Sequence, residues 1–236
     1  MTKKERAALA VAKLKELYPD AICSLEYNER KPYELLISTR LSAQCTDARV
    51  NIVTRDLFRE YPSLEAFAAA DLADVERIVK PCGFYHMKAK DIIEMSRCIL
   101  RDYNGVVPDS VEELTKLPGV GRKTANLIVG DVYGKPAVVT DTHCIRIAGR
   151  LGLTSGTTDP AKVEIELRAI LDPAESNDFC HRLVLFGRDT CVARGAKCEG
   201  CPLTEVCKSA GKPDAWKKAA KKPAARKPAA KKAANS

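Results

Sequence analysis

Residues 111–150 read VEELTKLPGVGRKTANLIVGDVYGKPAVVTDTHCIRIAGR, in which two short helical patterns flank the tight turn LPGVG. Leu117 and Val120 are placed to pin the two helices together, while Gly119 and Gly121 leave backbone amides bare. A helix N-terminus with free N–H groups and a positive dipole end suits a phosphate. The stretch predicts a clamp for a nucleic-acid backbone that reads no base sequence, although the turn alone fits an ordinary helical hairpin equally well.

Two residues near this turn are candidates for chemistry. Lys123 falls in the first turn of the second helix, and Asp141 directly precedes a third helical pattern. The dipole disfavours a cation at the lysine's position, and burial in a cleft would further favour the neutral, nucleophilic amine that Schiff-base chemistry needs. Asp141 is placed to cap a helix, which would also orient its carboxylate toward the lysine. We expect Asp141 to stabilise an oxocarbenium-like transition state and to assist proton transfer. A surface lysine and a plain N-cap are the alternatives.

A cluster of cysteines near the C-terminus predicts a metal site. The spacing C-x6-C-x2-C-x5-C is formed by Cys191, Cys198, Cys201 and Cys207. Tetrahedral zinc and a four-iron four-sulfur cluster both accept four thiolates, and the spacing leaves both open. Basic residues adjoin the ligands: Arg188, Arg194 and Lys197. A closed site surrounded by positive charge is typical of a structural centre that faces a phosphate backbone.

Helical periodicity extends through almost the whole chain and predicts an all-α fold. Helix N-caps are expected at Thr46 or Asp47, Ser63, Asp71, Asp109 or Ser110, and Asp159. Only residues 137–140 have strand character, and they are too few for a sheet. The remaining six cysteines lie in apolar helical contexts and are expected to be small buried hydrophobes: Cys23, Cys45, Cys82, Cys98, Cys144 and Cys180.

The N-terminal residues have a basic start followed by apolar positions at helical spacing: Ala7, Ala10, Leu14 and Leu17. This pattern predicts an amphipathic helix and not a secretory signal, and no apolar run approaches the roughly 18 residues of a membrane span. Residues 212–236 hold nine Lys or Arg and one acid, Asp214, which accounts for the net charge of +8 of the whole chain. We therefore expect a disordered basic tail on a neutral folded body. The tail either adds non-specific affinity for DNA or is a solubilising appendage.

Four motifs together resemble the endonuclease III family of helix-hairpin-helix DNA glycosylases and abasic-site lyases. These are LPGVGRKTAN, the VTDTH segment, LSAQCTD at residues 41–47, and the four-cysteine spacing. The resemblance runs from about residue 5 to 210 and implies two α-helical domains with the active site between them. A six-helix domain is expected at 25–135, and a cluster domain is expected to combine 1–24 with 136–211.

The resemblance also implies roles for individual residues. Lys123 matches the catalytic lysine and Asp141 the catalytic aspartate, while the four cysteines match the ligands of a 4Fe-4S cluster. Gln44 matches a residue that enters the space left by an extruded base. Phe84 stands where the family often has a leucine wedge. This departure bears on the range of lesions removed and on the preferred base opposite the lesion. His143 matches a residue that lines the pocket or contacts the abasic-site backbone.

The activity implied is removal of oxidised pyrimidines from double-stranded DNA, followed by β-elimination through a lysine Schiff base. Pyrimidine-dimer or mismatch glycosylases of the same fold are alternatives, and so is a non-catalytic DNA-binding module. Lys123 counts against the adenine-mismatch and thymine-mismatch branches, and both catalytic matches count against a non-catalytic module. The expected partner is DNA with a damaged base or an abasic site. We expect a monomer, without a membrane association, in the cytoplasm of a bacterium at the nucleoid.

Overall fold

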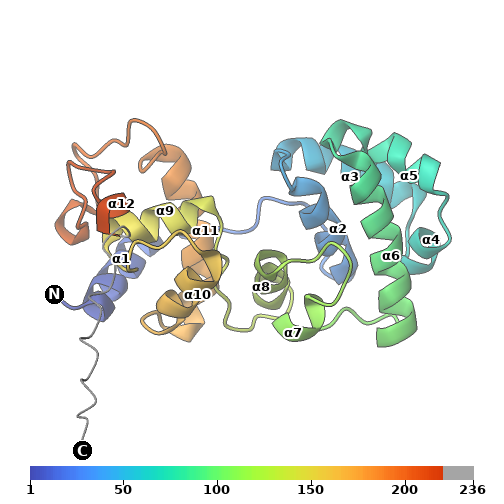
Figure 1. The fold of residues 1–236 in the computed structure, drawn as a ribbon, viewed down its shortest axis with the longest axis horizontal. Coiled ribbons are helices and arrows are strands. Elements are labelled where there is room, and N and C mark those ends of the chain that lie inside the picture. The colour runs from blue at the N-terminus through green and yellow to red at the C-terminus, as the bar shows by residue number, and fades with distance from the viewer. Residues whose placement is uncertain (220–236) are drawn as a thin grey trace, which may run out of the picture.

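A computed structural model describes residues 1–219. Figure 1 shows two groups of helices, one made of α2 to α8 and the other of α1 with α9 to α12. The first group contains α2 (Pro32–Ser42), α3 (Asp47–Glu60), α4 (Leu64–Ala68), α5 (Leu72–Val79), η1 (Lys80–Cys82), α6 (Tyr85–Tyr103), α7 (Val111–Leu114) and α8 (Arg122–Asp131). The second contains α1 (Lys3–Leu17), α9 (Thr142–Leu151), α10 (Pro160–Arg168), η2 (Pro173–Glu175), α11 (Ser176–Asp189), η3 (Thr204–Val206) and α12 (Trp216–Ala219). Since residues 1–219 include no strand, the all-α prediction is confirmed.

Short-range capping sets many of the helix starts. The side chains of Thr46, Ser63, Asp71, Ser110 and Asp159 accept hydrogen bonds from amides in the first turns of their helices. Each such bond satisfies a backbone donor that has no partner inside the helix. The caps predicted from the sequence are therefore confirmed, with Thr46 and Ser110 chosen over their acidic neighbours.

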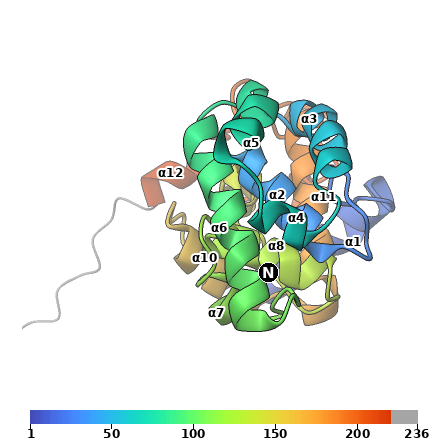
Figure 2. The same cartoon turned by 90° about the vertical axis from the view of Figure 1, so that its right-hand side faces the viewer.

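α2 forms the centre of the first group. All but a few of its residues are buried, and Figure 2 shows it with α3, α6 and α8 around it, which are the helices it contacts. α4 and α5 pack against α6 on the outside. The loop that follows α2 and carries Gln44 therefore starts from a mostly buried helix.

In the second group, α1 packs against α11, and α9 packs against both α11 and α12. Ala7, Ala10 and Leu14 are buried as expected, but Leu17 is 40% exposed, because the helix reaches its end before that residue meets the core. The predicted domain limits stay predictions. α8 contacts α11, so the two groups meet beside the helix that bears Lys123.

The first residues of the predicted tail pack onto the fold. Trp216 is buried against Gly149 of α9, where its indole leaves no room for a Cβ. The Pro213 carbonyl accepts a hydrogen bond from Arg150 Nε at 3.0 Å. The indole can lie this close to α9 because Gly149 has no side chain, which the composition of the tail does not reveal. The rest of the tail prediction, residues 220–236, lies outside the described residues.

Candidate active site

A cleft between the two groups of helices brings together residues from five parts of the chain. It has a volume of about 970 Å³ with its open mouth included, and its lining includes Lys123, Asp141 and His143. Asp47 of α3 and Arg188 of α11 line it as well. The structure thus places both predicted catalytic residues in one cavity, although 18 positions separate them along the chain.

Lys123 lies in the first turn of α8, which begins after Gly121. Its side chain lies on the cleft lining, but the residue is exposed, so the expected burial is wrong. The turn preceding α8 is short and leaves this end of the helix at the cleft mouth. What sets the lysine apart is its position, where the helix dipole opposes its charge and a carboxylate lies across the same cavity.

Asp141 both caps α9 and points into the cleft. One carboxylate oxygen accepts the Cys144 amide at 2.7 Å, and the other lies 2.9 Å from Nδ1 of His143. Burial raises the pKa of Asp141, but the hydrogen bonds from His143 and the Cys144 amide, with the charge of Lys123, outweigh it and hold that pKa below its usual value. Asp141 is therefore an ionised carboxylate in a fixed orientation, and the Nδ1–H of His143 donates to it.

His143 owes its place to a glycine on the neighbouring helix. A Cβ on Gly187 of α11 would lie 2.6 Å from Cδ2 of His143 and 2.8 Å from an Arg146 nitrogen. Only a residue without a side chain lets α9 and α11 approach closely enough for the imidazole to lie between them and reach Asp141. Nothing in the residue's own sequence neighbourhood indicates this requirement.

The hairpin between α7 and α8 has the features expected of a backbone clamp. Leu117 and Val120 are buried, whereas Gly119 and Gly121 are exposed. Gly119 has φ +73°, and a Cβ there would lie 2.9 Å from both the Arg40 side chain and Asp91 Cβ. Gly121 has an ordinary φ, with open space where a Cβ would be. Gly119 is therefore required by the fold, while Gly121 keeps the start of α8 accessible.

An ion pair supports the hairpin from behind. Arg40 of α2 and Asp91 of α6 lie 2.7 Å apart, and both are mostly buried. Because their side chains occupy the space next to the glycine turn, the position of the turn depends on α2 and α6 as well as on its own sequence. Sequence reasoning missed this pair, whose members are 51 residues apart.

Gln44 and Phe84 share an unusual backbone geometry. Gln44 has φ 56° and Phe84 has φ 48°, in the left-handed region that residues with a Cβ seldom adopt. Both are exposed, and Phe84 is 67% exposed, although a phenylalanine is ordinarily a core residue. Such strain persists only where the surroundings enforce it, and it is common at functional sites. Their exposure suits side chains that enter another molecule.

Arg188 occupies a different place from the one expected. It lies in the cleft and not beside the cysteines, and its guanidinium donates to Asp47 at 3.2 Å. Asp47 also accepts the Ser24 hydroxyl at 2.5 Å. The last turn of α11 points back toward α3, which turns Arg188 away from the cysteine segment. The exposed pair adds little stability, about 0–1 kcal/mol, but it spans the cleft between the two groups.

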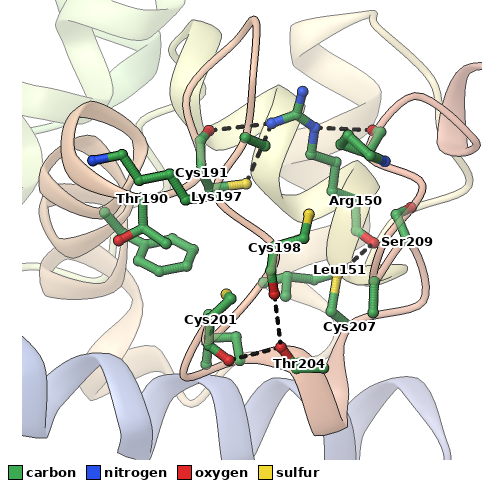
Figure 3. A pocket seen from close by; sticks show the side chains of 15 residues that line it. Arg150, Leu151, Thr190, Cys191, Lys197, Cys198, Cys201, Thr204, Cys207 and Ser209 are labelled. Carbon is green, nitrogen blue, oxygen red and sulfur yellow. Dashed lines mark hydrogen bonds between the residues drawn. The ribbon is translucent and has the colours of Figure 1, made fainter.

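The four predicted metal-ligating cysteines surround one hollow (Figure 3), with a volume of about 410 Å³ including open solvent. Lys197 and Thr204 line it with them. In the described part of the chain, no three His, Cys, Asp or Glu side chains are grouped to hold a single metal ion. The four thiols therefore face a shared space instead of converging on one point. No disulfide forms among the ten cysteines, all of which lie within residues 1–219, and of the six outside this segment Cys82, Cys144 and Cys180 are buried and Cys23, Cys45 and Cys98 half-buried.

Arg150 of α9 fastens the cysteine segment to the fold. Its guanidinium donates to the Cys191 carbonyl at 3.2 Å and the Cys191 sulfur at 3.3 Å (Figure 3), and to the Val192 carbonyl at 2.8 Å. Its own carbonyl accepts the Ser209 amide at 3.1 Å. This buried arginine joins the two ends of the segment, and the spacing of the cysteines alone does not point to it.

Comparison with known proteins shows the family. Residues 37–173 match the HhH-GPD superfamily of base excision DNA repair proteins. Endonuclease III of Synechocystis sp. is 43% identical over 210 residues, covering 89% of this chain and 94% of its own length. Endonuclease III of Bacillus subtilis is 41% identical over 202 residues, covering 86% and 91%. The chain belongs to the endonuclease III family. It is accordingly a base excision repair enzyme with DNA glycosylase and abasic-site lyase activity.

Solved structures agree with this assignment. A trapped endonuclease III–DNA covalent intermediate, in an estranged-adenine complex, has a TM-score of 0.84 and 39% identity, covering 90% of this chain and 99% of its own. A thermostable thymine-DNA glycosylase has a TM-score of 0.76 at 22% identity, which shows a shared fold only. The predicted helix-hairpin-helix glycosylase fold is confirmed. None of the described helices is long and apolar enough to cross a bilayer.

Proposed function

We propose that this enzyme removes oxidised, ring-saturated pyrimidines from double-stranded DNA and then cuts the strand at the abasic site, with Lys123 as nucleophile. The observation that carries the proposal is the meeting of Lys123 with the ionised carboxylate of Asp141 in one cleft. The similar endonuclease III that forms a covalent intermediate with DNA supports it. A glycosylase must move its target base out of the stack, and the cleft that holds these two residues is the place we propose for the extruded base.

In the proposed reaction the neutral Nζ of Lys123 attacks C1′ of the extruded nucleotide. The C1′–N bond breaks, and the base leaves with its electron pair and takes up a proton. Opening of the sugar ring gives a Schiff base between C1′ and Nζ; loss of a C2′ proton then expels the 3′ phosphate. Asp141 lies where its negative charge can stabilise the oxocarbenium-like sugar and accept the lysine's proton. His143 holds that carboxylate in place.

DNA binding in this proposal uses local contacts. The amides at Gly119 and Gly121 are offered to a phosphate by the hairpin, and Arg188 adds positive charge inside the cleft. Gln44 and Phe84 are the groups that replace the extruded base, and the aromatic ring of Phe84 can stack on a neighbouring or orphaned base. Outside these contact residues the described part of the chain carries little net charge. The geometry of the contacts must therefore supply most of the discrimination between damaged and undamaged DNA.

We further propose that the four cysteines hold a 4Fe-4S cluster. Zinc would draw four sulfurs to about 2.3 Å from one point, whereas a four-iron cluster keeps them apart around a larger volume. The spread of the thiols around a single hollow fits the larger group. When bound, the cluster supplies a rigid crosslink for the loop. Lys197 on that loop places a positive charge beside the cluster site. The proposed chemistry takes place at Lys123, in the separate cleft.

The test is borohydride trapping with three DNA duplexes, which carry thymine glycol, an abasic site or no lesion. We expect a covalent protein–DNA adduct with the first two and none with the third. Lys123→Ala should abolish the adduct, whereas Lys116→Ala, which removes an exposed charge just before the hairpin turn, serves as the control. A wild-type protein that gives no adduct on either damaged duplex would refute the lyase assignment. Duplexes carrying a pyrimidine dimer or a mismatch distinguish the alternatives of the same fold.

Two finer expectations belong to this proposal. The enzyme acts as a monomer, since one chain provides both catalytic residues and both proposed wedge residues. It works on chromosomal DNA in the bacterial cytoplasm. Sedimentation of the protein with a short damaged duplex would show one chain per duplex, and two chains per lesion would contradict the first expectation.

A further inference from the structure

Lys88 is a buried lysine that the proposed chemistry does not use. It lies in the first turns of α6 and is only 1% exposed. Its ammonium donates three hydrogen bonds, to the carbonyls of Leu41 at 2.8 Å, Ala43 at 2.8 Å and Cys82 at 2.9 Å. All three donors of the group are therefore used, and all three acceptors are backbone atoms.

The acceptors belong to two different segments. Leu41 and Ala43 are at the C-terminal end of α2, where the last carbonyls of a helix have no partner within it and carry the negative end of its dipole. Cys82 ends η1. Burial lowers the pKa of Lys88, while hydrogen bonds to three carbonyls stabilise its charged form. The lysine thus completes α2 and joins it to the segment after α5.

Each segment leads directly to one of the strained residues. Gln44 follows Ala43, and Phe84 comes two residues after Cys82. The Lys88 amide also donates to the Phe84 carbonyl at 3.2 Å. A left-handed backbone is unfavourable for a residue with a Cβ, so the surrounding structure must offset that strain. The ammonium of Lys88 is hydrogen-bonded to both segments at once, directly before each of them reaches its left-handed residue.

We infer that Lys88 is a positioning residue that fixes Gln44 and Phe84 relative to each other, so that both side chains enter the duplex as one unit during base extrusion. The inference rests on the proposed function and adds a residue that touches neither the DNA nor the reacting atoms. A lysine fits this role because its three donors radiate from one atom on a long apolar stem.

The test compares Lys88→Met, which keeps the stem and removes the donors, with Lys90→Met, which removes the same charge from an exposed position on the same helix. Two substrates separate the steps. A duplex with thymine glycol needs base extrusion, whereas a single-stranded abasic oligonucleotide needs only Schiff-base formation. We expect Lys88→Met to slow base removal from the duplex about tenfold to a hundredfold, while trapping on the single strand stays near wild type. Lys90→Met should leave both near wild type.

A double-mutant cycle identifies the route of the effect. In a Phe84→Ala background, Lys88→Met should cost much less than in the wild type, because the side chain it positions is already absent. Equal costs in both backgrounds, or a wild-type duplex rate for Lys88→Met, would overturn the inference. If Lys88→Met does not fold, Lys88→Gln keeps two donors and is put through the same cycle. A wild type inactive on both substrates would instead refute the proposed function.

Discussion

The carboxylate of Asp141 and the imidazole of His143 are joined by a hydrogen bond of 2.9 Å, two residues apart at the start of one helix. The other carboxylate oxygen is occupied by the Cys144 amide. The helix cap and the contact with His143 thus use different oxygens of one side chain, and the helix that Asp141 starts also determines the direction in which it faces the cleft.

His143→Ala should move the acid limit of activity upward. The native pKa of Asp141 lies below its usual value. Ionisation of this group therefore stabilises the fold above its unfolded pKa of about 3.9, and that stabilisation is lost as pH falls through the native value. Without His143 the opposing effect of burial is less balanced, so the pKa rises. Base-removal rates are measured from about pH 4 to 7. As the solution is acidified, the variant should lose activity at a higher pH than the wild type does; superimposable profiles would contradict the coupling.

Asp141→Asn should separate capping from charge. Asparagine caps helices about as well as aspartate, so the fold and DNA binding should be largely kept. Loss of the negative charge should slow base removal by about a hundredfold or more. Single-turnover rates and DNA affinity are measured together. Equal losses in both, with a lower melting temperature, would instead show that the residue matters mainly as a cap.

Gly119→Ala should affect the stability of the fold, whereas Gly121→Ala should affect DNA binding. The first places a Cβ at 2.9 Å from Arg40 and Asp91 with φ +73°, and we expect it to lower the free energy of unfolding by about 1–3 kcal/mol. The second meets open space and should leave stability within about 0.5 kcal/mol. If amides of this turn bind phosphate, Gly121→Ala should still weaken DNA binding. Urea unfolding and binding to an undamaged duplex measure the two effects.

Cys201→Ser should remove the yellow-brown colour expected of the cluster and lower thermal stability or DNA affinity. In any protein that still folds, Schiff-base formation on an abasic site should persist, since Lys123 and Asp141 lie outside the cysteine segment. The visible absorbance that gives this colour is measured alongside the trapping assay. A well-folded variant that has lost only its chemistry would contradict a structural role; a colourless wild type would favour zinc.

Local signals were enough to predict helix starts but not the supports of the site. Ser63 and Asp71 cap amides two or three residues away, so their roles are visible in the chain itself. Lys88 reaches Leu41 across 47 residues, and Arg150 reaches Pro213 across 63. Such partners become neighbours only through packing. The local pattern made Lys123 and Asp141 candidates, and the resemblance to a family gave each a role. The exposure of the lysine and the placement of Arg188 depended instead on how two helix groups meet.

Trp216 has a consequence for measurement, because it is the single tryptophan of the chain. Its indole is 8% exposed and lies on Gly149, one residue from the arginine that fastens the cysteine segment. Excitation at the red edge of protein absorbance therefore addresses one position, on the side of the molecule away from the cleft. Its emission should shift to longer wavelength when the cysteine segment loosens and stay unchanged when a cleft variant alters catalysis alone, so the protein carries its own optical reporter of that segment.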